Sequence, residues 1–291
     1  MRARICTLLL LLSLTASCTG AAGDDKAEDS PLEYPTGSTD VVLRLGLEGG
    51  FVPVQFNLTR LPDLTLYGDG RLIYPGPQIL IYPGPALPNI LVRRITPEGV
   101  AAIVREAVGA GLTGPDRNFQ ALQNWITDQP ETVFTLAVNG ETHSTRVYGL
   151  GSGVEATRVP QEEVEASERL LALRDRLTNL ESWLPEGSVG PEEPYAAGEL
   201  RVFVTDPAPA EEGLEQPPVV WPLAQPLAGF GSPAMPEGYR CGTISGEDLN
   251  RVLEAAGRAN QLTPWESAGA RFSLSFRPLL PDESGCPEPA A

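Results

Sequence analysis

The chain has 291 residues, and 42% of them are hydrophobic, which is enough to bury a core and excludes a wholly disordered protein. Its 38 acidic side chains outnumber its 21 basic ones, giving a formal net charge of −17. Such a surface repels a polyanion, so nucleic acid is excluded as an expected partner.

The chain opens with MRARICTLLLLLSLTASC, which has the pattern of an export signal. Arginines precede an apolar run, Ile5 to Leu14, that is too short to cross a bilayer comfortably. The small residues before Cys18 resemble a bacterial lipobox, although Leu14 stands one position too early. We therefore expect a signal peptide at residues 1–17 and acyl chains such as palmitate on Cys18. The protein would then be lipid-anchored on the outer face of the membrane, in the cell envelope. An ordinary secretory signal with a chance cysteine is the alternative.

Residues 18–40 are small, acidic and proline-containing, so we expect a flexible tether there. Beyond the signal and Cys18, the remaining cysteines are Cys241 and Cys286. In an oxidising compartment such a pair favours a disulfide. Two thiols and a single histidine are too few for a zinc site, and we expect no metal and no cofactor.

Residues 41–184 predict an α+β lobe. Strand patterns flank the turn sequence Gly68-Asp69-Gly70, and a strand-like hairpin encloses Asn139-Gly140. Thr96, followed by Pro and Glu, predicts the capped start of a helix, and a longer helix is expected from about residue 160 to 183. Between the first turn and Thr96, the pentapeptide IYPGP occurs twice, eight residues apart. We interpret the doubling as a tandem insertion that lengthens a strand connection, with a dedicated recognition motif as the alternative.

Residues 185–198 are rich in Pro, Gly and Glu and predict a linker, and residues 199–291 predict a second α+β lobe that carries the disulfide. Its helix sequence ISGEDLNRVLEAA parallels ITPEGVAAIVREA in the first lobe, which leaves a distant internal duplication open. The expected fold class is α+β, with two lobes that each contain an antiparallel sheet packed with one or more helices.

Three segments follow one another in the first lobe: LTLYGDGRLIY, ITPEGVAAIVREAVGAGL and TDQPETVFTLAVNGETHSTRVY. Their order resembles an uncharacterised α+β domain of exported bacterial proteins, including envelope lipoproteins of the GC-rich, actinobacterial type. The resemblance covers roughly residues 41–148. It implies a small α+β domain and supplies no activity and no catalytic residues.

Chemistry-bearing motifs are few in this sequence. Asp69 between glycines is typical of a turn, and His143 lacks the partners of a nucleophilic triad. Aromatic side chains beside prolines suggest a binding surface for an extended peptide or a glycan, with burial of the same rings as the alternative; they are Tyr74, Tyr82, Trp221 and Trp265. We expect a non-enzymatic lipoprotein that binds a protein, peptide or glycan or is structural in the envelope. An exported carboxylate-based hydrolase or an inhibitor-like module is the alternative.

Overall fold

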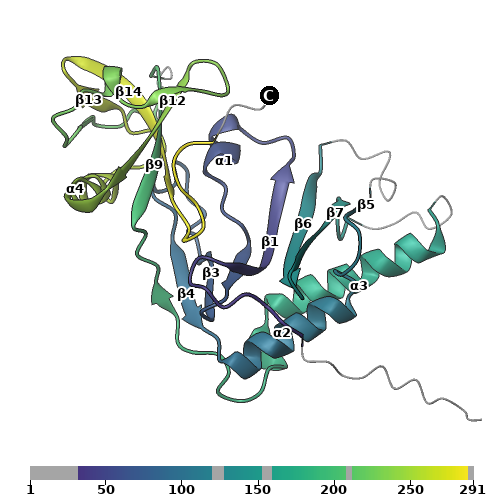
Figure 1. Cartoon of the computed structure of the whole chain (residues 1–291). Helices are drawn as coiled ribbons and strands as arrows, with labels where there is room; N and C mark the ends of the chain where they lie inside the picture. Colours follow the sequence, from purple (N-terminus) through teal and green to yellow (C-terminus); the bar gives the residue numbers. More distant parts are fainter. Residues whose placement is uncertain (1–31, 120–127, 153–158, 208–211, 288–291) are drawn as a thin grey trace, which may run out of the picture. The chain divides into compact units, whose positions relative to one another are not determined.

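The computed structural model describes residues 32–119, 128–152, 159–207 and 212–287. The expected signal peptide, Cys18 and the first part of the expected tether lie outside the described residues. The predicted α+β architecture is confirmed, because an eight-stranded sheet and a six-stranded sheet are combined with α-helices (Figure 1).

The larger sheet has the order β5-β7-β6-β1-β2-β3-β4-β8. Neighbouring strands are antiparallel except for β5 and β7, which are parallel. The predicted turns are confirmed: Gly68–Gly70 joins β2 to β3, and Asn139-Gly140 joins β6 to β7 with positive φ at both residues. The strands are β1 (Val41–Gly49), β2 (Leu64–Tyr67), β3 (Arg71–Pro75), β4 (Ile90–Arg94), β5 (Arg117–Phe119), β6 (Pro130–Val138), β7 (Glu141–Tyr148) and β8 (Glu193–Pro194).

Two helices, α2 (Pro97–Gly109) and α3 (Gln161–Leu177), cover one face of this sheet (Figure 1). The predicted cap is confirmed, since the Thr96 hydroxyl accepts a hydrogen bond from the backbone N–H of Gly99. Helix α3 ends earlier than expected, and a short 3₁₀ turn over Leu180–Ser182 follows it. Thr and Asn directly after Leu177 are poor helix formers, which is consistent with this earlier end.

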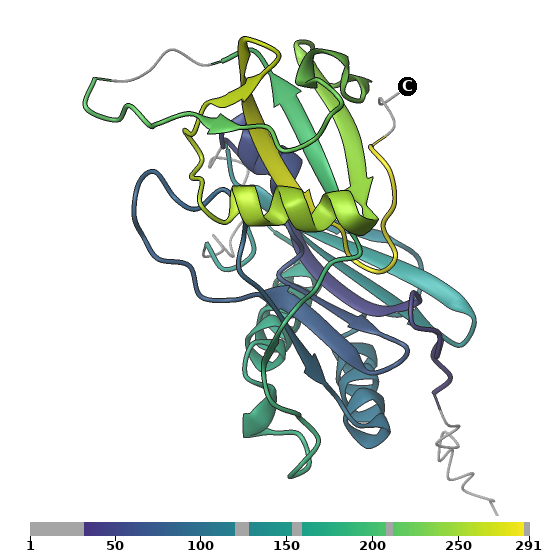
Figure 2. The same ribbon diagram turned by 90° about the vertical axis from the view of Figure 1, so that its left-hand side faces the viewer.

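The smaller sheet has the order β10-β13-β14-β9-β12-β11. Helix α4 (Gly246–Ala256) lies across one of its faces (Figure 2). The predicted disulfide joins Cys241 to Cys286, with 5.9 Å between the Cα atoms. It ties the segment after the last strand to the sheet. The strands are β9 (Glu199–Thr205), β10 (Val219–Val220), β11 (Ser232–Ala234), β12 (Tyr239–Ser245), β13 (Trp265–Ser267) and β14 (Ala270–Pro278).

Two segments that were expected to be free connections are packed against the protein. In the tether, Leu32 and Tyr34 contact the core of the larger lobe, and the backbone of Glu33 pairs with Asn139. In the linker 185–198, strand β8 extends the sheet beside β4, and the backbone carbonyl of Ser188 accepts a hydrogen bond from Thr96. These contacts satisfy backbone groups that would otherwise stay open at the sheet edge and at the helix start.

The two lobes share a helix start but differ in strand order. Ser245 occupies the same position before α4 as Thr96 does before α2, yet the Ser245 side chain makes no capping hydrogen bond. Strand β4, which precedes α2, is separated from the central β1 by β2 and β3, whereas β12, which precedes α4, pairs directly with the central β9. The similarity is therefore confined to a helix that follows a strand and begins after a hydroxyl residue.

Candidate functional site

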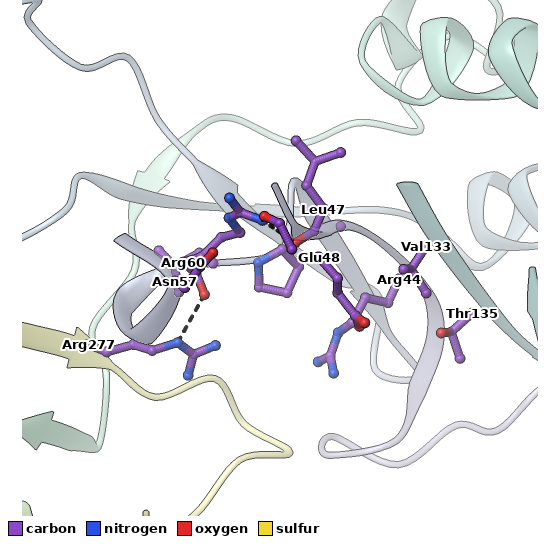
Figure 3. A pocket seen from close by; sticks show the side chains of 12 residues that line it. Arg44, Leu47, Glu48, Asn57, Arg60, Val133, Thr135 and Arg277 are labelled. Atoms are coloured by element: carbon purple, nitrogen blue, oxygen red, sulfur yellow. Dashed lines mark hydrogen bonds between the residues drawn. The ribbon is translucent and has the colours of Figure 1, made fainter. Parts of the chain in front are cut away.

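A cavity of about 520 Å³ opens on the face of the larger sheet that α2 and α3 leave uncovered (Figure 3). On β1, Leu43 and Leu45 point into the helix-covered core, so Arg44 and Gly46 face the cavity. The cavity, which we call the arginine groove, is lined by β1, β6, β14, helix α1 (Val54–Thr59) and the segment between α1 and β2. Its lining residues are Arg44, Gly46, Leu47, Glu48, Gly49, Asn57, Arg60, Leu61, Pro62, Val133, Thr135 and Arg277.

The C-terminal segment neutralises Arg44 at one side of the groove. The Arg44 Nη2 lies 2.7 Å from Oδ1 and 2.9 Å from Oδ2 of Asp282, and the Tyr67 hydroxyl donates to the same carboxylate. Burial acts to raise the pKa of Asp282, but the hydrogen bonds from Arg44 and Tyr67 outweigh it and hold that pKa below its usual range. Asp282 is therefore the ionised counterion of Arg44.

Arg277 of β14 forms a second ion pair at the opposite side. Its Nη2 lies 2.7 Å from Oε1 of Glu283, and its Nε donates to the backbone carbonyl of Arg60. The Arg277 side chain is only 8% exposed, so this is a largely buried pair. Burial acts to raise the pKa of Glu283, but the hydrogen bonds and charge of Arg277 lower it overall.

Arg60 differs from the other two arginines because no carboxylate among the described residues contacts it. Its Nη1 donates to the backbone carbonyls of Leu47 and Gly49, and its guanidinium lies over the ring of Phe56, 4.9 Å from the centroid. Its Nε is buried and has no hydrogen-bond partner. Burial lowers the pKa of Arg60, and the charge of Asp63 offsets this only in part. Arg60 is thus a guanidinium with donors that the described residues leave unused.

Three exposed apolar side chains lie in the segment before Arg60, and we call them the phenylalanine rim. Phe51 is 87% exposed, Phe56 is 53% exposed and Val54 is 41% exposed. They belong to α1 (Val54–Thr59) and the residues before it, and no residue of this helix is buried. Gln55 of the same helix donates to the hydroxyl of Tyr239, so the rim is held against the smaller lobe.

Comparisons of the chain with known protein families, with curated proteins and with solved structures find no match. The site is therefore interpreted from its own geometry.

A second exposed apolar surface lies in the connection between β3 and β4, which contains the second IYPGP copy. We call residues 79–82 the loop tip; Ile79 and Ile81 are 64% and 59% exposed, Leu80 is 101% exposed and Tyr82 is 62% exposed. Both ends of the connection are held: Gly76 donates to Asn89, and Gly84 accepts from Gln261 of the smaller lobe. A fixed loop thus presents four consecutive apolar side chains to solvent.

The structure does not bring the four predicted aromatic residues together. Trp221 and Trp265 are 4% and 1% exposed and pack edge to face in the core of the smaller lobe, with 6.0 Å between ring centroids. Tyr74 is half-buried in β3, where its hydroxyl donates to Glu192. Of the four, Tyr82 alone is on an exposed surface. The prediction for the two tryptophans is wrong because long-range packing between β10, β13 and β14 covers them.

The residues considered for catalysis have structural partners. Asp69 accepts from the backbone and side chain of Arg71 in the turn, and the His143 ring lies 2.7 Å from the carbonyl oxygen of Gly114. Burial raises the pKa of Asp63, and the charges of Arg174 and Arg60 oppose this shift. The described part of the chain contains no cluster of potential metal ligands. Within that same part, no helix is long and apolar enough to cross a membrane.

The arginine groove was not anticipated from the sequence. Single arginines in alternating strands, such as Arg44 and Arg277, are ordinary residues for an exposed sheet face. Their convergence depends on the pairing of distant segments. The exposure of Phe51 and Phe56, by contrast, had a local signal: they flank a proline in a short segment with no helical periodicity.

Proposed function

We propose that this protein is a lipid-anchored, extracytoplasmic binding protein of the bacterial envelope, without catalytic activity, that holds a protein or peptide partner. The single observation that carries the binding role is the exposure of large apolar side chains at the loop tip and the phenylalanine rim. Apolar groups gathered on an otherwise acidic surface are typical of interaction sites. The pattern around Cys18 and the Cys241–Cys286 disulfide support export and anchoring.

The anchoring proposal is tested by replacing Cys18 with Ala and fractionating the cells. The wild-type protein should sediment with membranes, and the Cys18→Ala variant should be released or left unprocessed. Equal membrane association of a processed variant would overturn the anchor. Two acyl chains anchor stably, whereas a single myristoyl chain binds only marginally, so the expected difference is large.

The binding proposal is tested by site-specific photocrosslinking in intact cells. A photoreactive side chain at Leu80 and another at Phe51 should each give crosslinked species above the mass of the monomer. The matched control is Glu168, an exposed residue of α3 on the opposite face of the larger sheet. The proposal is contradicted if Leu80 and Phe51 give no crosslinks. It is also contradicted if crosslinks at Glu168 are as abundant as those at Leu80 and Phe51.

A further inference from the structure

We propose that the arginine groove binds one carboxylate joined to an apolar group, such as the chain terminus of a peptide, with Arg60 as the main donor. This assignment gives the ligand chemistry of one surface and rests on the proposed binding function. It goes beyond that function because the groove is a polar site, distinct from the exposed loop tip.

Arg60 has hydrogen-bonding capacity that the described residues leave unused. Its Nη1 is occupied by two backbone carbonyls, while its Nη2 has no hydrogen-bond partner among the described residues. Because Nε is buried as well as unpartnered, the positive charge is partly desolvated without a contacting counterion. An anion at Nη2 would supply both the missing charge and a charge-assisted hydrogen bond.

The charges around the groove favour a ligand with a single negative charge. Arg44 and Arg277 are already paired with Asp282 and Glu283, so Arg60 is the one groove arginine whose charge no contacting carboxylate balances. Glu48 also lines the groove, but Arg146 already balances its charge, because the Arg146 Nη1 lies 2.6 Å from the Glu48 Oε2. One negative charge on the ligand therefore balances the charge of Arg60, whereas a dianionic phosphate would bring a surplus negative charge near three carboxylates. Planar carboxylates also suit the guanidinium geometry.

Apolar surface beside Arg60 favours an apolar group next to the carboxylate of the ligand. The Phe56 ring lies directly under the Arg60 guanidinium, and the exposed Phe51 and Val54 belong to the same segment. An anion at Arg60 therefore lies next to uncovered apolar surface. A ligand with an apolar group beside its carboxylate would cover that surface, whereas a small hydrophilic anion would not.

Polar groups around Arg60 complete the site. The side chains of Asn57 and Thr135 line the groove and have no hydrogen-bond partner among the described residues. They come from α1 and β6, on different sides of the cavity (Figure 3). An amide and a hydroxyl suit the backbone groups of a peptide that ends at Arg60.

The experiment uses the purified full-length protein and small probes. N-acetylphenylalanine carries one carboxylate on an apolar body, and N-acetylphenylalaninamide has the same body without the charge. Binding is measured by ligand-observed NMR titration. We expect the acid to bind about tenfold more tightly than the amide, which corresponds to one charge-assisted hydrogen bond. Inorganic phosphate at equal concentration should not displace the acid.

Variants identify the donor. Arg60→Met should remove the preference for the acid, while Arg105→Met, a change of equal charge at an exposed position of α2, should leave it intact. Asn57→Asp places a competing carboxylate at an exposed residue of the groove lining and should also abolish the preference for the acid. This second variant keeps the test decisive if Arg60→Met does not fold.

The assignment is overturned if acid and amide bind with equal affinity or if phosphate displaces the acid. It is also overturned if the Arg60 and Arg105 variants lose the preference for the acid to the same extent. These results do not depend on crosslinking in cells. A failure of the groove chemistry is thus distinguishable from a failure of the proposed binding function.

Discussion

Arg44 of β1 and Asp282 of the C-terminal segment form an ion pair between residues that are 238 positions apart in the sequence. The Tyr67 hydroxyl also donates to Asp282, and Leu280 packs with Tyr67 in a small apolar cluster. The segment after β14 therefore holds Arg44 at one side of the arginine groove and ties the smaller lobe to the larger sheet.

The first prediction concerns Asp282→Asn, which removes the negative charge but keeps the size of the side chain. Arg44 loses its counterion, so the free energy of unfolding should fall by about 2 kcal/mol, the usual cost of losing a hydrogen-bonded charged partner. Urea unfolding at pH 7 measures the change. Glu247→Gln is the control, because Glu247 is 93% exposed in its ion pair and should matter little. Equal effects of the two substitutions would contradict a structural role for Asp282.

The second prediction is the pH dependence of stability. The pKa values of Asp282 and Glu283 are both lowered in the folded state, for the reasons given above. In the unfolded chain these two carboxyl groups have pKa values of about 4, so on acidification the unfolded chain takes up protons before the folded protein does. The stability that the two groups contribute is therefore fully present above about pH 4 and is lost as the pH falls through their folded pKa values. Urea unfolding between pH 7 and pH 3 should show this fall. The double variant Asp282→Asn, Glu283→Gln should show a shallower fall, and an unchanged slope would contradict the prediction.

Local features of the fold could be predicted from the sequence because local chemistry determines them. Positive φ at Asn139-Gly140 follows from residues that tolerate it, and the Thr96 cap follows from a hydroxyl beside free backbone N–H groups. The Cys241–Cys286 disulfide followed from the small number of cysteines. None of these inferences required knowledge of distant contacts.

The candidate site could not be predicted, because it is formed by contacts between distant segments. The two IYPGP copies show this limit most directly. Ile73 of the first copy is 1% exposed within β3, whereas Ile81 of the second copy is 59% exposed in the loop tip. The isoleucine thus has opposite environments in the two copies, and the pairing of β3 with β2 and β4 distinguishes them. Trp221 and Trp265 were misplaced for the same reason.

The third prediction concerns the disulfide. The bond spans 45 residues, so Cys286→Ser should lower the free energy of unfolding by about 4 kcal/mol in the chain-entropy model. Urea unfolding of the oxidised proteins measures it. Since Asp282 lies four residues before Cys286, releasing the end should also weaken the Arg44 contact. Asp282→Asn should therefore cost less in the Cys286→Ser background, and full additivity would show that the two constraints are independent.

The fourth prediction compares the two helix starts. Thr96→Ala removes the hydroxyl that accepts from Gly99 and should cost about 1 kcal/mol of unfolding free energy. Ser245→Ala is the matched control, because the Ser245 side chain makes no capping hydrogen bond, and its effect should be near zero. Thermal and urea unfolding of both variants measure the difference. A larger loss at Ser245 would show that its hydroxyl caps α4 in solution.

The fifth prediction concerns the loop tip. Leu80 is fully exposed, so Leu80→Asp removes no packing and should change the free energy of unfolding by less than about 0.5 kcal/mol. A charge among Ile79, Ile81 and Tyr82 should nevertheless abolish the association of an apolar partner surface, because burying an unpaired carboxylate is costly. Partner crosslinking from a neighbouring photoreactive residue at Ile79 reports the loss. Leu72→Asp is the opposite case: Leu72 lies directly before the first copy, as Leu80 lies directly before the second, and it is buried, so this variant should destabilise the fold itself. If Leu80→Asp leaves the crosslinks unchanged, the loop tip is not the surface that the partner covers.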